Sequence, residues 1–196
     1  MEGTRYAGQD CSLARALEVI GERWTLLIIR DSFYGVRHFN DFRAHLDIPK
    51  AILADRLAGL VDDRILDRRT DPSHAGRHLY ELTQAGRDLW PAMHALLTWG
   101  AQHRAPNRLL FRHARCLTEL DHRGHCQACQ LIPPPVEVLA DPAPGRGSRR
   151  QDPVTLALRD PHPLLQPLDT TRRPGNDKYQ QNPATPTPAD RRGASS

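Results

Sequence analysis

The stretch 37–82 constrains the fold of this chain more than any other part of its sequence. Residues 39–46 predict a short helix with three apolar side chains on one face, and the two residues that follow allow only a tight turn. A proline suits the first turn of a second helix, 49–64, in which apolar residues recur at helical spacing. Two short strands, 65–69 and 78–82, are then expected on either side of a loop with a proline and a glycine.

This order of helix, tight turn, helix and hairpin is the layout of a winged helix-turn-helix, in which the second helix enters the major groove of DNA. Residues 12–20 predict an amphipathic helix ahead of it. Residues 25–34 are apolar on most sides, which fits a central helix, although a buried strand has the same pattern. We therefore expect a mainly α fold with a small β-hairpin wing, in the α+β class.

The predicted last helix of this unit, 84–103, is apolar on more than one face. Such a helix needs a partner surface, and in a small domain the natural partner is a second subunit. Pro91 lies inside the helix and removes a backbone donor, so we expect a bend or a break near Leu89 and Trp90. The sequence thus predicts a terminal dimerisation helix and a homodimer.

The composition of the chain changes after Arg104. Thirteen of the 17 prolines lie between residues 133 and 188, and a segment so rich in proline and poor in apolar side chains does not offset its ordering entropy. The expected division is an N-terminal arm, a DNA-binding and dimerisation domain, a small Cys/His unit and a disordered tail. These segments are expected at 1–10, 11–104, 105–139 and 140–196.

The charge of the chain is less informative than it first looks. The net charge is +4 and the isoelectric point about 9.1, but residues 11–103 hold 12 Lys and Arg against 12 Asp and Glu. DNA binding must therefore depend on where individual side chains lie. With no apolar run that could span a membrane, no signal peptide and no catalytic set, we expect a cytoplasmic protein that is not an enzyme.

The expected DNA contacts come from three places. The outer face of the second helix offers a lysine and an aspartate to bases or phosphates, and alanines that allow close approach or touch a thymine methyl. Arginines beside the helix suit backbone phosphates, and those of the wing suit a minor groove. The full set is Arg37, Lys50, Ala51, Ala54, Asp55, Arg56, Arg69, His74 and Arg77. The alternative is that these are ordinary solvated residues.

Several blocks within residues 11–100 are similar to the HxlR-type winged-helix regulators, a branch related to the MarR family. The matching blocks are 11–30 with its Gly-x-x-Trp-Thr segment, 37–42, 53–57, and 80–86 with its Tyr-x-Leu-Thr-x-x-Gly segment. The resemblance implies a homodimeric bacterial transcription factor, more often a repressor, that reads a near-palindromic operator. This chain departs from the family at the outer face of its recognition helix, which has little hydrogen-bonding capacity. A protein-interaction module that has lost DNA reading is the alternative.

The resemblance also implies a role for Cys11, because an N-terminal cysteine at this position senses oxidants or electrophiles in some relatives. Such a role requires an exposed thiol with a lowered pKa. A small, buried and inert cysteine is the alternative. A small-molecule inducer near the dimer interface is the other expected means of control.

A second group of cysteines follows the DNA-binding domain. Two ligand pairs at two-residue spacing suit tetrahedral zinc, namely His113, Cys116, Cys126 and Cys129. His122 and His125 are alternatives to His113 as the fourth ligand of the predicted site. Neither pair is followed by the glycine expected of a zinc knuckle. We therefore expect either a closed, structural zinc site or an unstructured linker.

Overall fold

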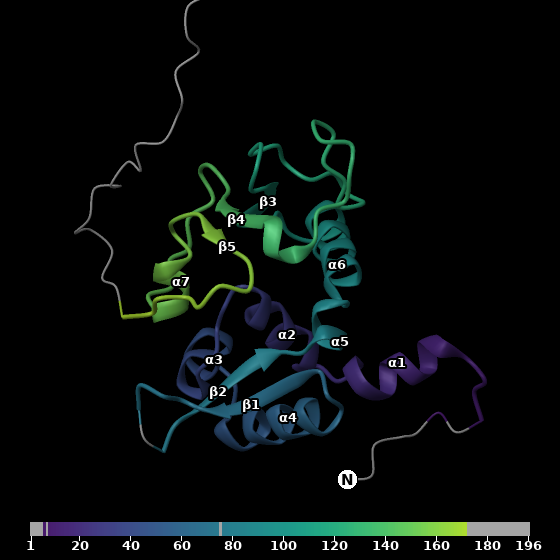
Figure 1. Ribbon diagram of the computed structural model, residues 1–196, viewed down its shortest axis with the longest axis vertical. Helices are drawn as coiled ribbons and strands as arrows, with labels where there is room; N and C mark the ends of the chain where they lie inside the picture. Colours follow the sequence, from purple (N-terminus) through teal and green to yellow (C-terminus); the bar gives the residue numbers. More distant parts are fainter. Residues whose placement is uncertain (1–5, 7, 75, 172–196) are drawn as a thin grey trace, which may run out of the picture.

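The computed structural model describes residues 6, 8–74 and 76–171 (Figure 1). The winged half, residues 11–103, contains α1 (Ser12–Ile20), α2 (Thr25–Phe33), α3 (Phe39–Leu46), α4 (Lys50–Asp62), β1 (Leu66–Thr70), β2 (His78–Leu82), α5 (Gln84–Arg87) and α6 (Trp90–His103). The C-terminal lobe, residues 105–171, contains β3 (Leu109–His113), the 3-10 helix η1 (Pro135–Glu137), β4 (Val138–Pro142), α7 (Pro153–Ala157) and β5 (His162–Pro163). The predicted α+β class is confirmed. None of the helices among these residues is long and apolar enough to cross a membrane.

The helix-turn-helix is formed by α3 and α4, as the sequence predicts. Phe42 of α3 and Leu53 of α4 are fully buried in a common core. Asp47 ends α3 in the left-handed conformation, with a φ of 54°, and so turns the chain toward α4. The wing is an antiparallel hairpin of β1 and β2, in which Leu66 pairs with Leu82 beside that core.

The long helix predicted after the wing is divided in two. α5 begins after Thr83, whose hydroxyl accepts a hydrogen bond from the backbone N–H of Gly86. α6 begins at Trp90 with Pro91 in its first turn, where a proline is tolerated because its missing N–H would have no partner within the helix. The expected break near Leu89 is therefore confirmed.

The prediction of a disordered tail is wrong for residues 140–171, while residues 172–196 lie outside the described part of the chain. Most of β4 and all of α7 and β5 fall in this segment. Val154 and Leu164 are almost completely buried. The apolar residues of the segment are too widely spaced to produce a periodic pattern, but they reach a common core.

The C-terminal lobe is tied to the end of α2. The backbone N–H groups of Leu165 and Leu168 donate to the carbonyl oxygens of Phe33 and Gly35, at 2.8 and 3.0 Å. Gly35 has a φ of 83°, and a side chain there would overlap the carbonyl oxygen of Gln166. Glycine is required here because it alone combines this backbone conformation with so close an approach.

One hydrophobic core runs through both halves. The ring of Trp90 in α6 lies 5.1 Å from that of Phe33 in α2 and 5.2 Å from that of Phe111 in β3. All three side chains are buried. In Figure 1 the winged half lies at the bottom, α6 rises from it, and the β3–β4–β5 sheet lies above. The lobe is thus packed on the winged half.

Candidate DNA-binding surface and metal cluster

One face of α4 is open to solvent. Of the five residues of this helix that are expected to contact DNA, Arg56 is half-buried and the other four are exposed, namely Lys50, Ala51, Ala54 and Asp55. Lys50 is the first residue of the helix, and the N-terminal residues of a recognition helix are the ones that reach base edges. The face is therefore accessible to DNA, and its contact with DNA stays a prediction.

The wing presents further basic residues. The side chain of Arg69 is 66% exposed, and the nearer of its two acidic neighbours is 3.6 Å away. Arg77 is exposed as well, and so is Arg68, which was not among the predicted residues. The Nδ1 atom of His74 lies 3.3 Å from the carboxylate of Asp71, so this histidine is linked to the turn that supports the wing.

Two of the predicted phosphate contacts already have acidic partners. Arg37 forms an ion pair with Glu81, at 2.6 Å, and donates a hydrogen bond to the carbonyl oxygen of Leu165. Arg56 lies 3.4 Å from the neighbouring carboxylate of Asp55. Arg37 thus connects β2 with the C-terminal lobe, and it would have to leave Glu81 to reach a phosphate.

Cys11 is exposed and precedes the first turn of α1. The backbone N–H groups of Ala14 and Leu13 lower the pKa of its thiol below the ordinary value. Exposure and a lowered pKa are the two properties that a reactive cysteine needs. The chemistry for redox sensing is present, and sensing itself stays a prediction.

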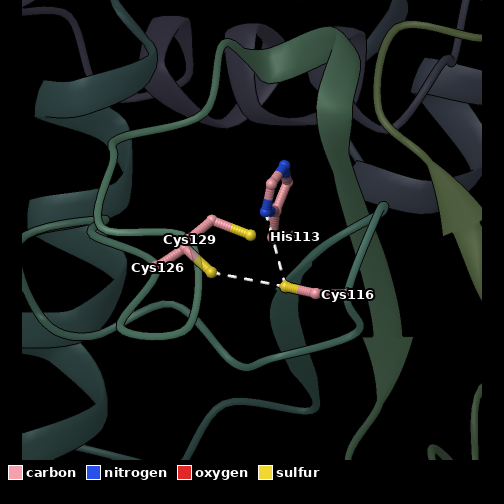
Figure 2. A group of neighbouring side chains, drawn as sticks. All are labelled: His113, Cys116, Cys126 and Cys129. Atoms are coloured by element: carbon pink, nitrogen blue, oxygen red, sulfur yellow. Dashed lines mark hydrogen bonds between the residues drawn. The ribbon is translucent and has the colours of Figure 1, made fainter.

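Four side chains of the C-terminal lobe converge on one point (Figure 2). The ligand atoms of His113, Cys116, Cys126 and Cys129 all lie within 4.8 Å of one another. The Cys116 sulfur lies 3.5 Å from Nδ1 of His113 and 3.4 Å from the Cys126 sulfur. The ligand atoms of a tetrahedral zinc ion lie roughly 3.5–3.8 Å apart, given its usual bond lengths. The cluster can therefore hold a metal ion.

His113 is the histidine of this cluster, and neither His122 nor His125 belongs to it. Its ring is completely buried, with Nε2 3.3 Å from a carboxylate oxygen of Glu137. Metal-binding histidines usually donate their second N–H to such a carboxylate, which fixes the tautomer and the ring orientation. The arrangement leaves Nδ1 available to a metal. Glu137 was not found from the sequence because it lies 24 residues away along the chain.

The turns that carry the cysteines have the left-handed backbone conformation of a zinc knuckle, although no glycine stands at these positions. Leu117 follows Cys116 with a φ of 59°, and Gln130 follows Cys129 with a φ of 55°. This left-handed conformation costs a non-glycine residue about 1–2 kcal/mol. The N–H of each donates to the carbonyl oxygen of the first residue in its ligand pair, at 2.8 Å. The missing glycines therefore do not prevent the two turns.

The thiols of the cluster influence one another. Hydrogen bonds from Thr118 lower the pKa of Cys116 to about 6. The pKa of Cys129, in contrast, is raised to about 11, first by the hydrogen bond between Cys129 and Cys116. The two shifts are linked, because the Cys116 thiolate that Thr118 stabilises opposes a second negative charge at Cys129. A divalent cation removes this repulsion and deprotonates its thiol ligands.

The sequence reasoning missed a group of arginines at the seam between the two halves. They line one cavity together, namely Arg30, Arg108, Arg146, Arg150 and Arg159. Beside them the buried carboxylate of Asp31 lies 2.7 Å from both Arg30 and His45. No local pattern could reveal this group, because its members are brought together only by the packing of the lobe.

The fold and the open face of α4 define a class of protein, the helix-turn-helix regulators of transcription. A model of the HxlR-like helix-turn-helix family matches residues 19–108. Two curated relatives, the uncharacterised HTH-type transcriptional regulators Mb3122 of Mycobacterium bovis and Rv3095 of Mycobacterium tuberculosis, are each 40% identical over 144 residues, which is 72% of this chain and 90% of theirs. The solved structure of the redox regulator HypR in its oxidized form is 29% identical and covers 48% of this chain and 98% of that chain, with a TM-score of 0.45.

The chain belongs to the HxlR-like helix-turn-helix family and is a transcriptional regulator of the HTH type. The predicted family and class of function are confirmed. A match of 144 residues cannot fit within residues 1–108, so the similarity to the mycobacterial relatives extends into the C-terminal lobe.

Proposed function

We propose that the protein binds operator DNA in a sequence-dependent way as a homodimer and acts in the cytoplasm as a repressor. The observation that supports DNA binding most directly is the exposed face of α4 beside an exposed basic wing. α4 would lie in the major groove with Lys50 near base edges, while Arg69 and Arg77 would reach phosphates or the minor groove. A bound dimer would block access of the polymerase to the promoter.

Homodimerisation is supported by apolar side chains that remain exposed to solvent on two helices. Leu13 and Leu17 of α1 are 64% and 40% exposed, and Leu96 and Trp99 of α6 are each 51% exposed. Figure 1 shows α1 extending away from the rest of the winged half. A second copy would cover these faces and would place two α4 helices about one turn of DNA apart.

Control of DNA binding is proposed at two points. Oxidation of the exposed Cys11 thiol, which lies beside the apolar face of α1, would alter the dimer. A small-molecule inducer would act on the same equilibrium from another site. Either signal would change the distance between the recognition helices and hence the fit to the operator.

The metal cluster is proposed to hold structural zinc. Three cysteines and a histidine are a ligand set that favours zinc. Four protein ligands fill its coordination, so the ion would brace the lobe and would offer no position to a substrate. This role agrees with a regulator that has no catalytic function.

Fluorescence anisotropy with duplex DNA from the protein's own upstream region tests the proposal. We expect salt-sensitive binding that prefers this sequence over random DNA, weakened about tenfold by Lys50→Ala or Arg69→Ala. Arg123→Ala, which removes an exposed charge from the C-terminal lobe, is the control and should bind normally. Equal binding to random and upstream DNA by folded protein would favour the protein-interaction alternative, and a monomer in light scattering would contradict the dimer.

A further inference from the structure

A cavity of about 480 Å³ lies at the seam between the winged half and the C-terminal lobe. Its walls come from α2, α3 and the second half of α6 on one side, and from β3, the segment after β4, and α7 on the other. Most of its lining residues lie beyond residue 108, outside the segment that the family model matches. Its volume is typical of sites for small molecules.

Part of the cavity wall is apolar. Phe111 and Leu158 are buried there, and Leu97 and Leu109 are half-buried. The ring of Tyr34 stacks beside that of Phe111, with 6.5 Å between centroids and 20° between planes. These surfaces offer contact to a flat or aliphatic body of a ligand.

The polar part of the cavity is positively charged. Five arginines line it, and no aspartate or glutamate does. Two of the arginines are balanced by acidic neighbours just outside the lining: Arg30 lies 2.7 Å from Asp31, and Arg150 lies 3.0 Å from Asp152.

The other three arginines have neutral partners. The described ion pairs include no carboxylate for Arg108, Arg146 or Arg159. Instead, Arg108 donates to the hydroxyl of Ser148, and Arg146 donates to the carbonyl oxygen of Asn107 at 3.2 Å. Arg108, Arg146 and Arg159 are exposed, and guanidinium groups without a carboxylate partner are suited to an anionic ligand, because they can each offer a forked pair of N–H donors.

We infer that this cavity binds a small organic anion, with one carboxylate, sulfonate or phosphate group on an apolar body of up to three rings. The anionic group pairs with Arg108 and Arg146, and the apolar body packs on Phe111 and Leu158. These four residues belong to the C-terminal lobe, and the opposite wall of the cavity comes from α2, α3 and α6, so a ligand that fills the cavity lies between the lobe and the winged half. Its effect on DNA, as the inducer, rests on the proposed function, whereas its binding does not.

Two probes with the same ring system test the charge and the apolar body separately. The fluorescent anion 8-anilinonaphthalene-1-sulfonate carries a sulfonate that neutral N-phenyl-1-naphthylamine lacks. With the folded full chain we expect the anion to bind at least tenfold more tightly than the neutral probe, and inorganic sulfate alone to compete poorly. Methyl resonances of Leu97 and Leu158 should shift on binding, and those of Leu60, a buried residue of α4 outside the cavity, should not.

Variants then locate the anionic group. Arg108→Gln combined with Arg146→Gln should weaken the anionic probe by on the order of tenfold or more, because two charge-assisted contacts are lost. The neutral probe and the unfolding midpoint should stay unchanged. Arg149→Gln is the matched control, since Arg149 is exposed nearby and does not line the cavity.

The outcomes separate this inference from the proposed function. Equal affinity for both probes, or an unchanged affinity in the double variant, would overturn the anion site while leaving DNA binding intact. Arginine-dependent binding of the anion by a protein that ignores DNA would support the site and contradict the regulator.

Discussion

The winged half and the C-terminal lobe reach their stability by different means. The winged half packs amphipathic helices around fully buried side chains such as Ile28, Phe33 and Leu53. The lobe has strands of two to five residues and one α-helix of five residues. So small a unit usually needs an additional cross-link, such as a bound metal ion, to be stable. The hydrogen bonds to the end of α2 supply one such cross-link, and the proposed metal ion would supply another. Removing one of these cross-links should therefore destabilise the lobe before the winged half.

The largest effect is expected from Cys126→Ser. Cys126 is completely buried in the cluster, and its loss should abolish metal binding and lower the unfolding midpoint by on the order of 10 °C. Hydrogen exchange should lose protection over 109–142 but not over 25–62. Cys11→Ser is the control and should keep the metal. Purified protein without metal, under reducing conditions and without chelator, would contradict the zinc proposal.

The next largest effect is expected from Gly35→Ala. The left-handed backbone and the overlap with Gln166 should cost about 2–3 kcal/mol of unfolding free energy, measured by urea denaturation. Gly59→Ala is the matched control within α4, where an added Cβ meets nothing within 4 Å, and it should gain about 0.5–1 kcal/mol. An equal effect of both substitutions would show that the lobe does not depend on its contact with α2.

A smaller effect, on metal affinity and not on the fold, is expected from Glu137→Gln. The amide can still accept from Nε2 of His113 but carries no charge, so metal affinity should fall about tenfold while the fold is kept. Competition with a chromophoric chelator measures the change. Glu119→Gln removes an exposed carboxylate of the same lobe and should leave the affinity unaltered. Unchanged affinity in Glu137→Gln would show that this carboxylate does not position the histidine.

The smallest effect should be a gain in stability, from Leu117→Gly. Leu117 has a φ of 59° and is 57% exposed, so Leu117→Gly should relieve backbone strain with little loss of packing. We expect the unfolding free energy to rise by about 0.5–1 kcal/mol, measured in the metal-loaded protein. A clear loss of stability would mean that the leucine side chain holds the turn.

The same division explains what the sequence could predict. In the winged half, α3, α4 and the wing follow from local spacing and turn residues, because each element is read within about a dozen residues. In the lobe, β3 pairs with β4 across a long loop, residues 109–113 against 138–142, and no local pattern encodes that pairing. The four residues of the Cys/His cluster could be named from the sequence because each pair is local, whereas Glu137 and the arginines of the cavity depend on packing.

The rings of Phe33, Trp90 and Phe111 have a consequence for where this chain can be divided. The family match ends at residue 108, but a cut there would remove Phe111 and expose the other two rings to water, at about 1.5–3 kcal/mol for each side chain fully uncovered. A boundary drawn from similarity is thus not a boundary at which the chain can be divided. In this chain the winged half and the lobe therefore depend on one another through the ring pairs of Phe33, Trp90 and Phe111.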